Sequence, residues 1–105
     1  MVRETNLIRG ASLLCILVLG ASVHAQPVAR EGRLTTPAGL TLYTFANDVV
    51  SSGKSACYPP CSNLHPPYLV EQGVSASGDL SVVERSDGAK QWAHKGKPLY
   101  LWIYD

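Results

Sequence analysis

The chain has 105 residues and a nearly balanced charge, with nine Lys and Arg against eight Asp and Glu and a formal net charge of +1. Nucleic-acid binding depends on clustered positive charge, so this balance gives no electrostatic basis for it. The length suits one small domain, which buries only about 60 to 65% of its unfolded surface. We therefore expect a covalent staple or a partner to support the fold.

The first 25 residues have the pattern of a cleaved export signal. Arg3 and Arg9 precede an apolar run over residues 11–21, and Val23-His24-Ala25 has the small-x-small form of a signal-peptidase site. The run is shorter than the roughly 20 residues that a membrane-spanning helix needs, which disfavours an uncleaved transmembrane anchor. We expect a mature chain of residues 26–105 in the periplasm or secreted into the medium.

Cleavage would also change the charge and the cysteine count. It would remove Arg3, Arg9 and Glu4, which leaves seven basic and seven acidic side chains. It would remove Cys15, which follows two leucines and so lacks the small preceding residue of a lipid-modified cysteine. An even pair, Cys57 and Cys61, remains, and such a pair in an oxidising compartment indicates a structural disulfide.

Two other interpretations of the cysteine pair stay open. Cys57, Cys61 and His65 recur every four residues, and His94 could complete a zinc site. The same cysteines could instead form a redox-active thiol pair. Metal binding is the weaker pattern, because Pro59-Pro60 interrupts the helix that would align the ligands. We expect no cofactor.

From residue 26 onward the pattern predicts short antiparallel strands. After a polar lead over residues 26–32, a hairpin is expected from 33–35 and 40–45 around a turn at 36–39. Further strands are expected at 80–85, 90–94 and 98–104, joined by turns at Ser86-Asp87-Gly88 and Lys95-Gly96-Lys97. Residues 46–67 read as an irregular loop with the cysteines and one short helical turn. The predicted fold class is a mainly β domain built from two hairpin-like repeats.

A ten-residue pattern, G-x-x-L-Y-x-aromatic-x-x-D, occurs at residues 39–48 and again at 96–105. An internal repeat indicates one structural unit used twice and packed against its own copy. The pattern contains no obvious nucleophile, phosphate-binding loop or metal-ligand set.

Five ordered motifs resemble a known family. They are Leu42-Tyr43-Thr44-Phe45-Ala46-Asn47-Asp48, Cys57-x-x-x-Cys61, Asn63-x-x-Pro66-Pro67, Arg85-x-Asp87-Gly88-x-x-Gln91-Trp92 and Gly96-Lys97-Pro98-Leu99-Tyr100. Together they resemble the bacterial secreted-repeat family described as predicted lipoproteins with a Y-x-[FWY]-x-x-D motif, whose activity is unknown. The resemblance covers nearly all of residues 26–105 and implies export and two copies of the repeat.

The chain departs from the family pattern in three places. Leu64-His65 stands where members tend to place Trp, and Tyr68 stands where an aliphatic residue is usual. In Tyr58-Pro59-Pro60 each residue before a proline favours extended geometry, so a disulfide across it needs a bend, for example a cis bond before Pro60. The second repeat ends at its Asp, and it therefore reads as truncated. A terminal strand over 98–104 would be apolar on both faces and open to self-association.

The motif residues allow two interpretations each. Asp48 and Asp105 are expected to close turns by accepting backbone N–H bonds, or alternatively to be equivalent ligands for a cation or sugar hydroxyls. The motif aromatics are expected in the core or at the repeat interface, with a ligand platform as the alternative. They are Tyr43, Phe45, Tyr100 and Trp102, together with Trp92.

Enzymatic activity is not expected. Gly73 and Gly78 have the spacing of a phosphate-binding loop, but Asp79 replaces the required Lys. No serine or histidine pattern pairs a nucleophile with a base. The sequence favours an exported, non-enzymatic envelope or extracellular domain that binds a partner or has a structural role. The alternative is a periplasmic thiol-redox or metal-binding protein using Cys57, Cys61 and His65.

Overall fold

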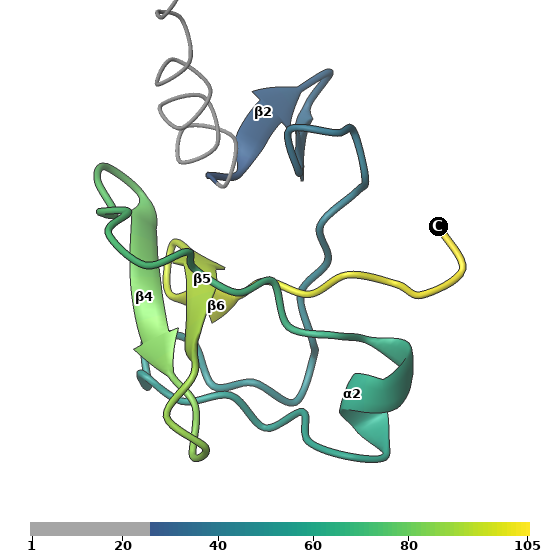
Figure 1. Ribbon diagram of the computed structural model, residues 1–105, viewed down its shortest axis with the longest axis vertical. Helices are drawn as coiled ribbons and strands as arrows, with labels where there is room; N and C mark the ends of the chain where they lie inside the picture. Colours follow the sequence, from purple (N-terminus) through teal and green to yellow (C-terminus); the bar gives the residue numbers. More distant parts are fainter. Residues whose placement is uncertain (1–25) are drawn as a thin grey trace, which may run out of the picture.

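The computed structural model describes residues 26–105, and the predicted export signal lies outside the described residues. Two antiparallel sheets make up the regular structure (Figure 1). The first pairs β2 (Val28–Arg30) with β3 (Arg33–Thr35), and the second has the order β4 (Leu80–Glu84), β5 (Lys90–His94) and β6 (Lys97–Pro98). The single helix of the described part, α2 (Cys61–Leu64), has one turn. The mainly β prediction is confirmed.

The β2–β3 hairpin corrects the prediction of a polar lead over residues 26–32. Val28 pairs with Thr35, and Ala29 pairs with Leu34. Glu31 and Gly32 form the turn with φ values of 49° and 81°, the two left-handed residues that a tight hairpin turn requires. Glu is an uncommon first residue for such a turn, so the turn has only a weak signal in the sequence.

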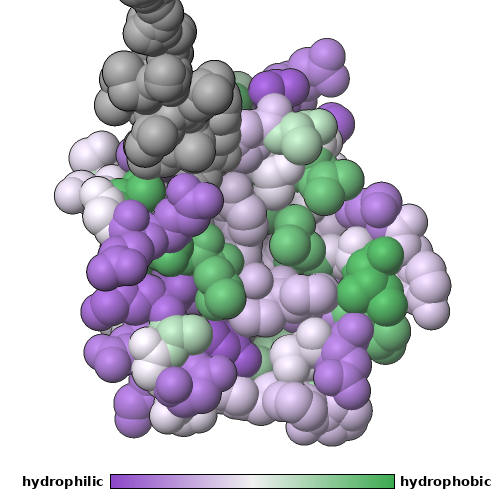
Figure 2. Space-filling model, viewed as in Figure 1, coloured by the Kyte–Doolittle hydropathy of each residue, from purple (hydrophilic) through white to green (hydrophobic). Residues whose placement is uncertain are grey.

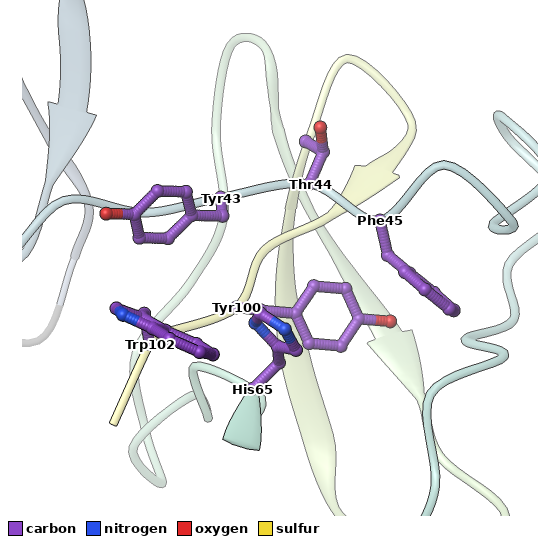
Figure 3. A pocket seen from close by; sticks show the side chains of 6 residues that line it. All are labelled: Tyr43, Thr44, Phe45, His65, Tyr100 and Trp102. Carbon is purple, nitrogen blue, oxygen red and sulfur yellow. The ribbon is translucent and has the colours of Figure 1, made fainter. Parts of the chain in front are cut away.

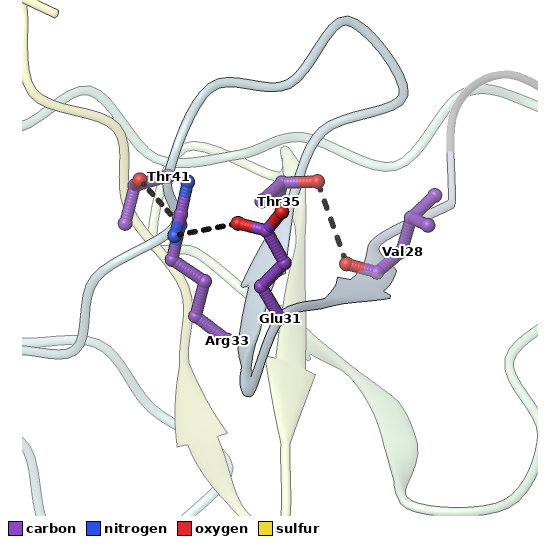
Figure 4. Close-up of polar contacts among 5 residues, drawn as sticks. All are labelled: Val28, Glu31, Arg33, Thr35 and Thr41. Carbon is purple, nitrogen blue, oxygen red and sulfur yellow. Dashed lines mark hydrogen bonds and ion pairs between the residues drawn. The ribbon is translucent and has the colours of Figure 1, made fainter.

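Side chains support this hairpin (Figure 4). The Thr35 hydroxyl donates to the Thr36 carbonyl at 2.8 Å and lies 3.5 Å from the Val28 carbonyl across the hairpin. Arg33 Nε donates to Thr41 Oγ1 at 3.2 Å. A long ion pair of 3.9 Å joins the exposed Arg33 and Glu31 across the turn. Contacts of this exposed kind contribute little stability. The Arg33–Thr41 hydrogen bond joins the hairpin to the residues that follow β3.

Residues 40–45, the predicted partner strand of residues 33–35, pair with that strand only at their start. Gly39 N–H closes the turn onto the Thr36 carbonyl at 2.9 Å, and Leu42 N–H donates to the Leu34 carbonyl at 2.9 Å. Tyr43, however, pairs with Tyr100 instead. Residues 40–45 therefore form isolated bridges rather than the continuous strand that their alternation predicted.

The predicted strand over 98–104 is also wrong as a continuous element. Regular pairing stops at Pro98, and Tyr100 is bridged by Tyr43 and by Pro67. Because Pro67 has no N–H, it cannot extend a ladder on that side. Residues 99–101 are nevertheless bonded within the chain, since Tyr68 N–H donates to Leu99 at 3.0 Å and Leu101 N–H donates to Pro66 at 2.8 Å.

Three segments close around the core through a ring of backbone hydrogen bonds. Trp92 donates to Tyr68 at 2.9 Å, Tyr68 donates to Leu99 at 3.0 Å, and Leu99 donates to Trp92 at 2.8 Å. The buried side chains of Trp92, Leu99 and Leu42 form the centre of the core. Partly buried apolar residues surround it: Leu34, Tyr68, Val70, Val74, Ala76, Leu80 and Leu101.

The surface carries apolar side chains in scattered places. Figure 2 shows the hydrophobic atoms on this face as several separate patches among polar surface. Ile103 is 45% exposed and Tyr104 is 74% exposed near the end of the segment that was predicted to self-associate. Self-association through 98–104 stays a prediction. Within residues 26–105 no helix has both the length and the apolar character needed to cross a bilayer.

The two motif glycines provide a matched test of packing. Gly39 and Gly96 both have positive φ, 97° and 80°, but only Gly96 faces a neighbour, since a Cβ there would lie 2.9 Å from the Ser51 backbone nitrogen. We expect Gly39→Ala to cost about 1–2 kcal/mol from backbone strain. Gly96→Ala should cost about 1–3 kcal/mol more because Ser51 N–H donates to the Gly96 carbonyl and must move.

Urea unfolding of both variants would measure this difference. Equal losses of unfolding free energy would show that the approach of Ser51 to Gly96 is unimportant for stability.

Candidate functional site

The two sequence repeats meet at their tyrosines. Tyr43 N–H donates to the Tyr100 carbonyl and Tyr100 N–H donates to the Tyr43 carbonyl, each at 2.8 Å. These reciprocal bonds form an antiparallel bridge between equivalent positions of the two copies. The repeat copies are therefore related by an approximate twofold axis that passes between Tyr43 and Tyr100.

The motif acids follow the same symmetry. Tyr100 donates its hydroxyl to Asp48 Oδ2 at 2.7 Å, and Tyr43 donates its hydroxyl to Asp105 Oδ2, also at 2.7 Å. Each tyrosine thus bonds the acid of the other repeat. Each copy of the Y-x-[FWY]-x-x-D motif supplies one Tyr and one Asp to this reciprocal pair of hydrogen bonds. This explains why Tyr and Asp occur together in each copy.

The two halves of this cross-link differ in burial. Tyr100 is 1% exposed, whereas Tyr43 is 38% exposed. Asp48 also accepts the Ala56 N–H at 2.6 Å, as the turn interpretation expects, so both of its oxygens are used. Asp105 lies on the surface. The Asp48 half is therefore structural, and the Asp105 half borders solvent.

A buried polar network continues from Tyr100. Since the Asp48 carboxylate can only accept, Tyr100 donates to it, and Ser55 must donate its hydroxyl to Tyr100 at 2.6 Å. The Ser55 oxygen in turn accepts from Arg85 at 3.0 Å. This chain of hydrogen bonds links a buried guanidinium to a carboxylate through two hydroxyls.

Arg85 is 5% exposed, and a charge at such a site needs several partners. It donates to Gln91 Oε1 at 2.8 Å and to the Cys57 carbonyl at 2.7 Å, and it lies 4.3 Å from the centre of the Tyr58 ring. Gln91 then donates to the Leu99 carbonyl at 2.7 Å. The network therefore ties the cysteine loop to β5 and to the residues that directly follow β4 and β6.

The surroundings of the two tyrosine hydroxyls raise their pKa values. Burial, followed by the hydrogen bond to the Asp48 carboxylate, raises the pKa of Tyr100 to about 12. The hydrogen bond to Asp105 raises the pKa of the more exposed Tyr43. In both cases ionisation of the phenol would place two negative charges side by side.

The cysteines form the predicted disulfide. The Cys57 and Cys61 sulfurs are 2.04 Å apart and their Cα atoms are 5.3 Å apart. The required bend is present, with a cis peptide bond between Pro59 and Pro60. Cys61 begins α2, and His65 follows the end of this helix. The disulfide thus fixes the segment from which the His65 ring projects.

The disulfide uses both sulfurs that the metal interpretation needs. His65 instead packs against Trp102, with ring centres 4.8 Å apart. Among residues 26–105, no group of three or more His, Cys, Asp or Glu side chains is placed to hold a metal ion. The structure therefore does not assemble Cys57, Cys61, His65 and His94 into the alternative site.

The aromatic motif residues divide into core and surface. Trp92 and Tyr100 are buried, and Phe45 meets the Tyr100 ring edge-on at 6.1 Å. Trp102 is half-buried between His65 and Tyr104, the latter at 5.2 Å. The inner rings, Trp92 and Tyr100, thus lie in the core, and a ligand platform of the outer rings stays a prediction.

The outer rings border a pocket of about 350 Å³ beside the repeat interface. It is lined by Tyr43, Thr44, Phe45, His65, Tyr100 and Trp102. Figure 3 shows Tyr43 and Trp102 on one side, Phe45 on the other, and the His65 and Tyr100 rings between them. The volume falls at the lower end of the roughly 300–1,000 Å³ range of small-molecule sites.

Sequence reasoning missed the polar network behind this pocket. Ser55, Arg85 and Gln91 were not considered as a group, although Arg85 and Gln91 belong to the motif quoted for the family resemblance. A charged residue six positions before a glutamine, with a turn between them, gives no signal of burial in the sequence. Only the β4–β5 turn brings them together, through the bond from Arg85 N–H to the Ala89 carbonyl at 2.7 Å.

Comparison with known proteins supports the presence of two repeat copies in this chain. Residues 30–67 and 81–105 match a family described as a secreted repeat of unknown function. Each matched segment contains one copy of the motif. No curated protein and no solved structure matches the chain.

The two motif acids should contribute unequally to stability. Asn offers one acceptor oxygen, so Asp48→Asn must lose either the Tyr100 or the Ala56 hydrogen bond in a half-buried setting, at a cost of about 1–3 kcal/mol. Asp105→Asn can keep its bond from Tyr43 at the surface and should cost less than about 1 kcal/mol. Denaturant unfolding of the two variants compares them directly. A larger loss for Asp105→Asn would contradict the assigned roles.

Tyr100 should make stability fall at high pH. The folded protein keeps this phenol protonated up to about pH 12, whereas an unfolded tyrosine ionises near pH 10. The unfolded state therefore releases the proton first, and the contribution of Tyr100, complete below pH 10, is lost as the pH rises toward 12. Absorbance titration of tyrosinate should show this late ionisation, and Tyr100→Phe should remove it. An unchanged titration curve in Tyr100→Phe would contradict the assignment.

Proposed function

Because this chain belongs to the family of secreted repeats of unknown function, we propose that it is an exported, non-enzymatic binding module whose ligand site is the aromatic pocket. The observation that carries the proposal is the unequal burial of the two repeat halves. One Tyr–Asp pair is buried as a structural link, and the other stands at the rim of a pocket.

The pocket is supported from behind by groups that do not line it. The Asp48–Tyr100–Ser55–Arg85 hydrogen bonds fix the inner ring, and the disulfide fixes the segment leading to His65. Rings held in this way need little ordering when a ligand binds, which favours affinity. Rigid aromatic side chains with a fixed backing are typical of recognition sites.

The chemistry of the lining favours binding over catalysis. Its polar side chains are Thr44, His65 and the two tyrosines. In Figure 3 the Thr44 hydroxyl points away from His65, so the two are not arranged as nucleophile and base. The Tyr43 and Tyr100 hydroxyls donate to Asp105 and Asp48. We therefore propose that the domain binds a ligand without converting it.

We further propose that residues 1–25 direct export and are removed, which leaves a mature domain in the periplasm or the medium. Intact-mass analysis of protein exported from a bacterial host tests this directly. The expected mass is that of residues 26–105 less two hydrogens for the disulfide. A full-length mass would refute cleavage, and retention of both thiol hydrogens would refute the disulfide in the exported protein.

Binding at the pocket can be tested with a library of small organic fragments. We expect fragments detected by ligand-observed NMR to shift amide signals of Phe45, His65 and Trp102, and to lose binding in Trp102→Ala. Val82→Ala is a suitable control, because Val82 is an exposed apolar residue of β4 that does not line the pocket. Fragments that bind elsewhere, or equally well to Trp102→Ala, would contradict the proposed site.

A further inference from the structure

The aromatic pocket combines several electron-rich ring faces with an absence of formal charge in its lining. Five of its six lining residues are aromatic or imidazole rings, and none is Lys, Arg, Asp or Glu. The face of an aromatic ring carries a negative electrostatic potential, which attracts cations. A ligand that presents positive charge over a bulky apolar surface would therefore suit this lining.

The two carboxylates add to this potential from outside the lining. Asp105 and Asp48 each accept the hydroxyl proton of a lining tyrosine at 2.7 Å. A phenol that donates to a carboxylate gains electron density on its oxygen and ring, and the carboxylate itself contributes a negative field. The hydrogen bond to Asp105 raises the pKa of Tyr43, and the bond to Asp48 adds to the effect of burial in raising the pKa of Tyr100.

The positive groups nearby are largely offset. Arg33 is the cation that acts on Tyr43, and its guanidinium lies 3.9 Å from the Glu31 carboxylate. Arg85 is buried, does not line the pocket, and donates to Ser55, Gln91 and Cys57. The two carboxylates accept hydrogen bonds from tyrosines that line the pocket, whereas Arg33 and Arg85 bond groups outside the lining.

Three other ligand classes fit less well. A sugar stacks on aromatic rings but needs several hydrogen-bonding groups for its hydroxyls. Both tyrosine hydroxyls already donate to carboxylates, which leaves Thr44 and His65 as the polar side chains of the lining besides the Trp102 indole. An anion would face the negative ring surfaces with no lining Lys or Arg to bind it. A neutral apolar ligand would use the rings but not the carboxylates.

We propose that the pocket binds the head of an organic cation, specifically a quaternary or methylated ammonium group. Tyr43, Phe45 and Trp102 surround the ammonium head, Tyr100 forms the floor, and Asp105 supplies a charge at the rim. This inference rests on the proposed binding function and names the chemical class of its ligand.

Choline and its neutral isostere 3,3-dimethylbutan-1-ol provide the test, since they share shape and differ in charge. Titration of the mature domain by NMR or calorimetry should show choline binding about tenfold more tightly, the ratio expected for roughly 1.4 kcal/mol of cation–ring attraction. Choline should also shift the amide signals of Phe45 and Trp102. Methyl glucoside serves as the sugar probe and should not bind.

Variants separate charge from shape. Trp102→Leu and Phe45→Leu keep apolar bulk but remove a ring, and each should weaken choline binding by at least about fivefold. Val82→Ala again serves as the control, because Val82 is 39% exposed and does not line the pocket. Asp105→Asn should weaken choline binding while leaving that of the neutral isostere unchanged. Amide spectra of each variant check that the fold is retained.

The outcomes distinguish this inference from the broader function. Equal or tighter binding of the isostere at the pocket would overturn the cationic ligand and leave the binding site intact. Binding of methyl glucoside without choline would do the same in favour of sugars. Choline binding that persists in both Leu variants, or choline shifts confined to residues away from the pocket, would also overturn it. Failure of every fragment and probe at the pocket would overturn the site itself.

Discussion

The fold depends on the reciprocal pairing of two tyrosines. Tyr43 and Tyr100 exchange both backbone hydrogen bonds, and each donates its hydroxyl to the acid of the opposite repeat. A small domain has little apolar core to hold its segments together, so polar links with both partners satisfied become important for a unique structure. The core of Trp92, Leu99 and Leu42 forms around this pairing, because Leu42 and Leu99 directly precede the two tyrosines.

The two sides of this pairing differ in burial, and the candidate site lies on the exposed side. On one side, Asp48, Ser55 and Arg85 bury Tyr100 in a satisfied network beside the disulfide loop. On the other side, Tyr43 and Asp105 remain at the surface, where Trp102 and His65 extend the aromatic wall. An exact twofold arrangement would have left two equal halves. The two copies instead differ in burial, which gives one structural half and one half that borders solvent.

Several elements could be predicted from the sequence because their signals are local. The Asp87-Gly88 turn and the β4–β5 hairpin follow from turn chemistry and alternation, and the disulfide follows from an even cysteine pair after export. The bend at Pro59-Pro60 follows from the geometry that the bridge requires. The strands expected at 40–45 and 98–104 failed because an alternating pattern cannot show that Tyr100 pairs with both Tyr43 and Pro67.

The sequence by itself determined the repeat, the mainly β class, the cysteine bridge and the residue types available for a site. Only the tertiary structure decided which acid serves which tyrosine, and which aromatic rings are buried. The physical reason is distance along the chain. Tyr43 and Asp105 are separated by 62 residues, and Tyr100 and Asp48 by 52, so no local pattern encodes their contact. Their meeting depends on how the whole chain closes around its core.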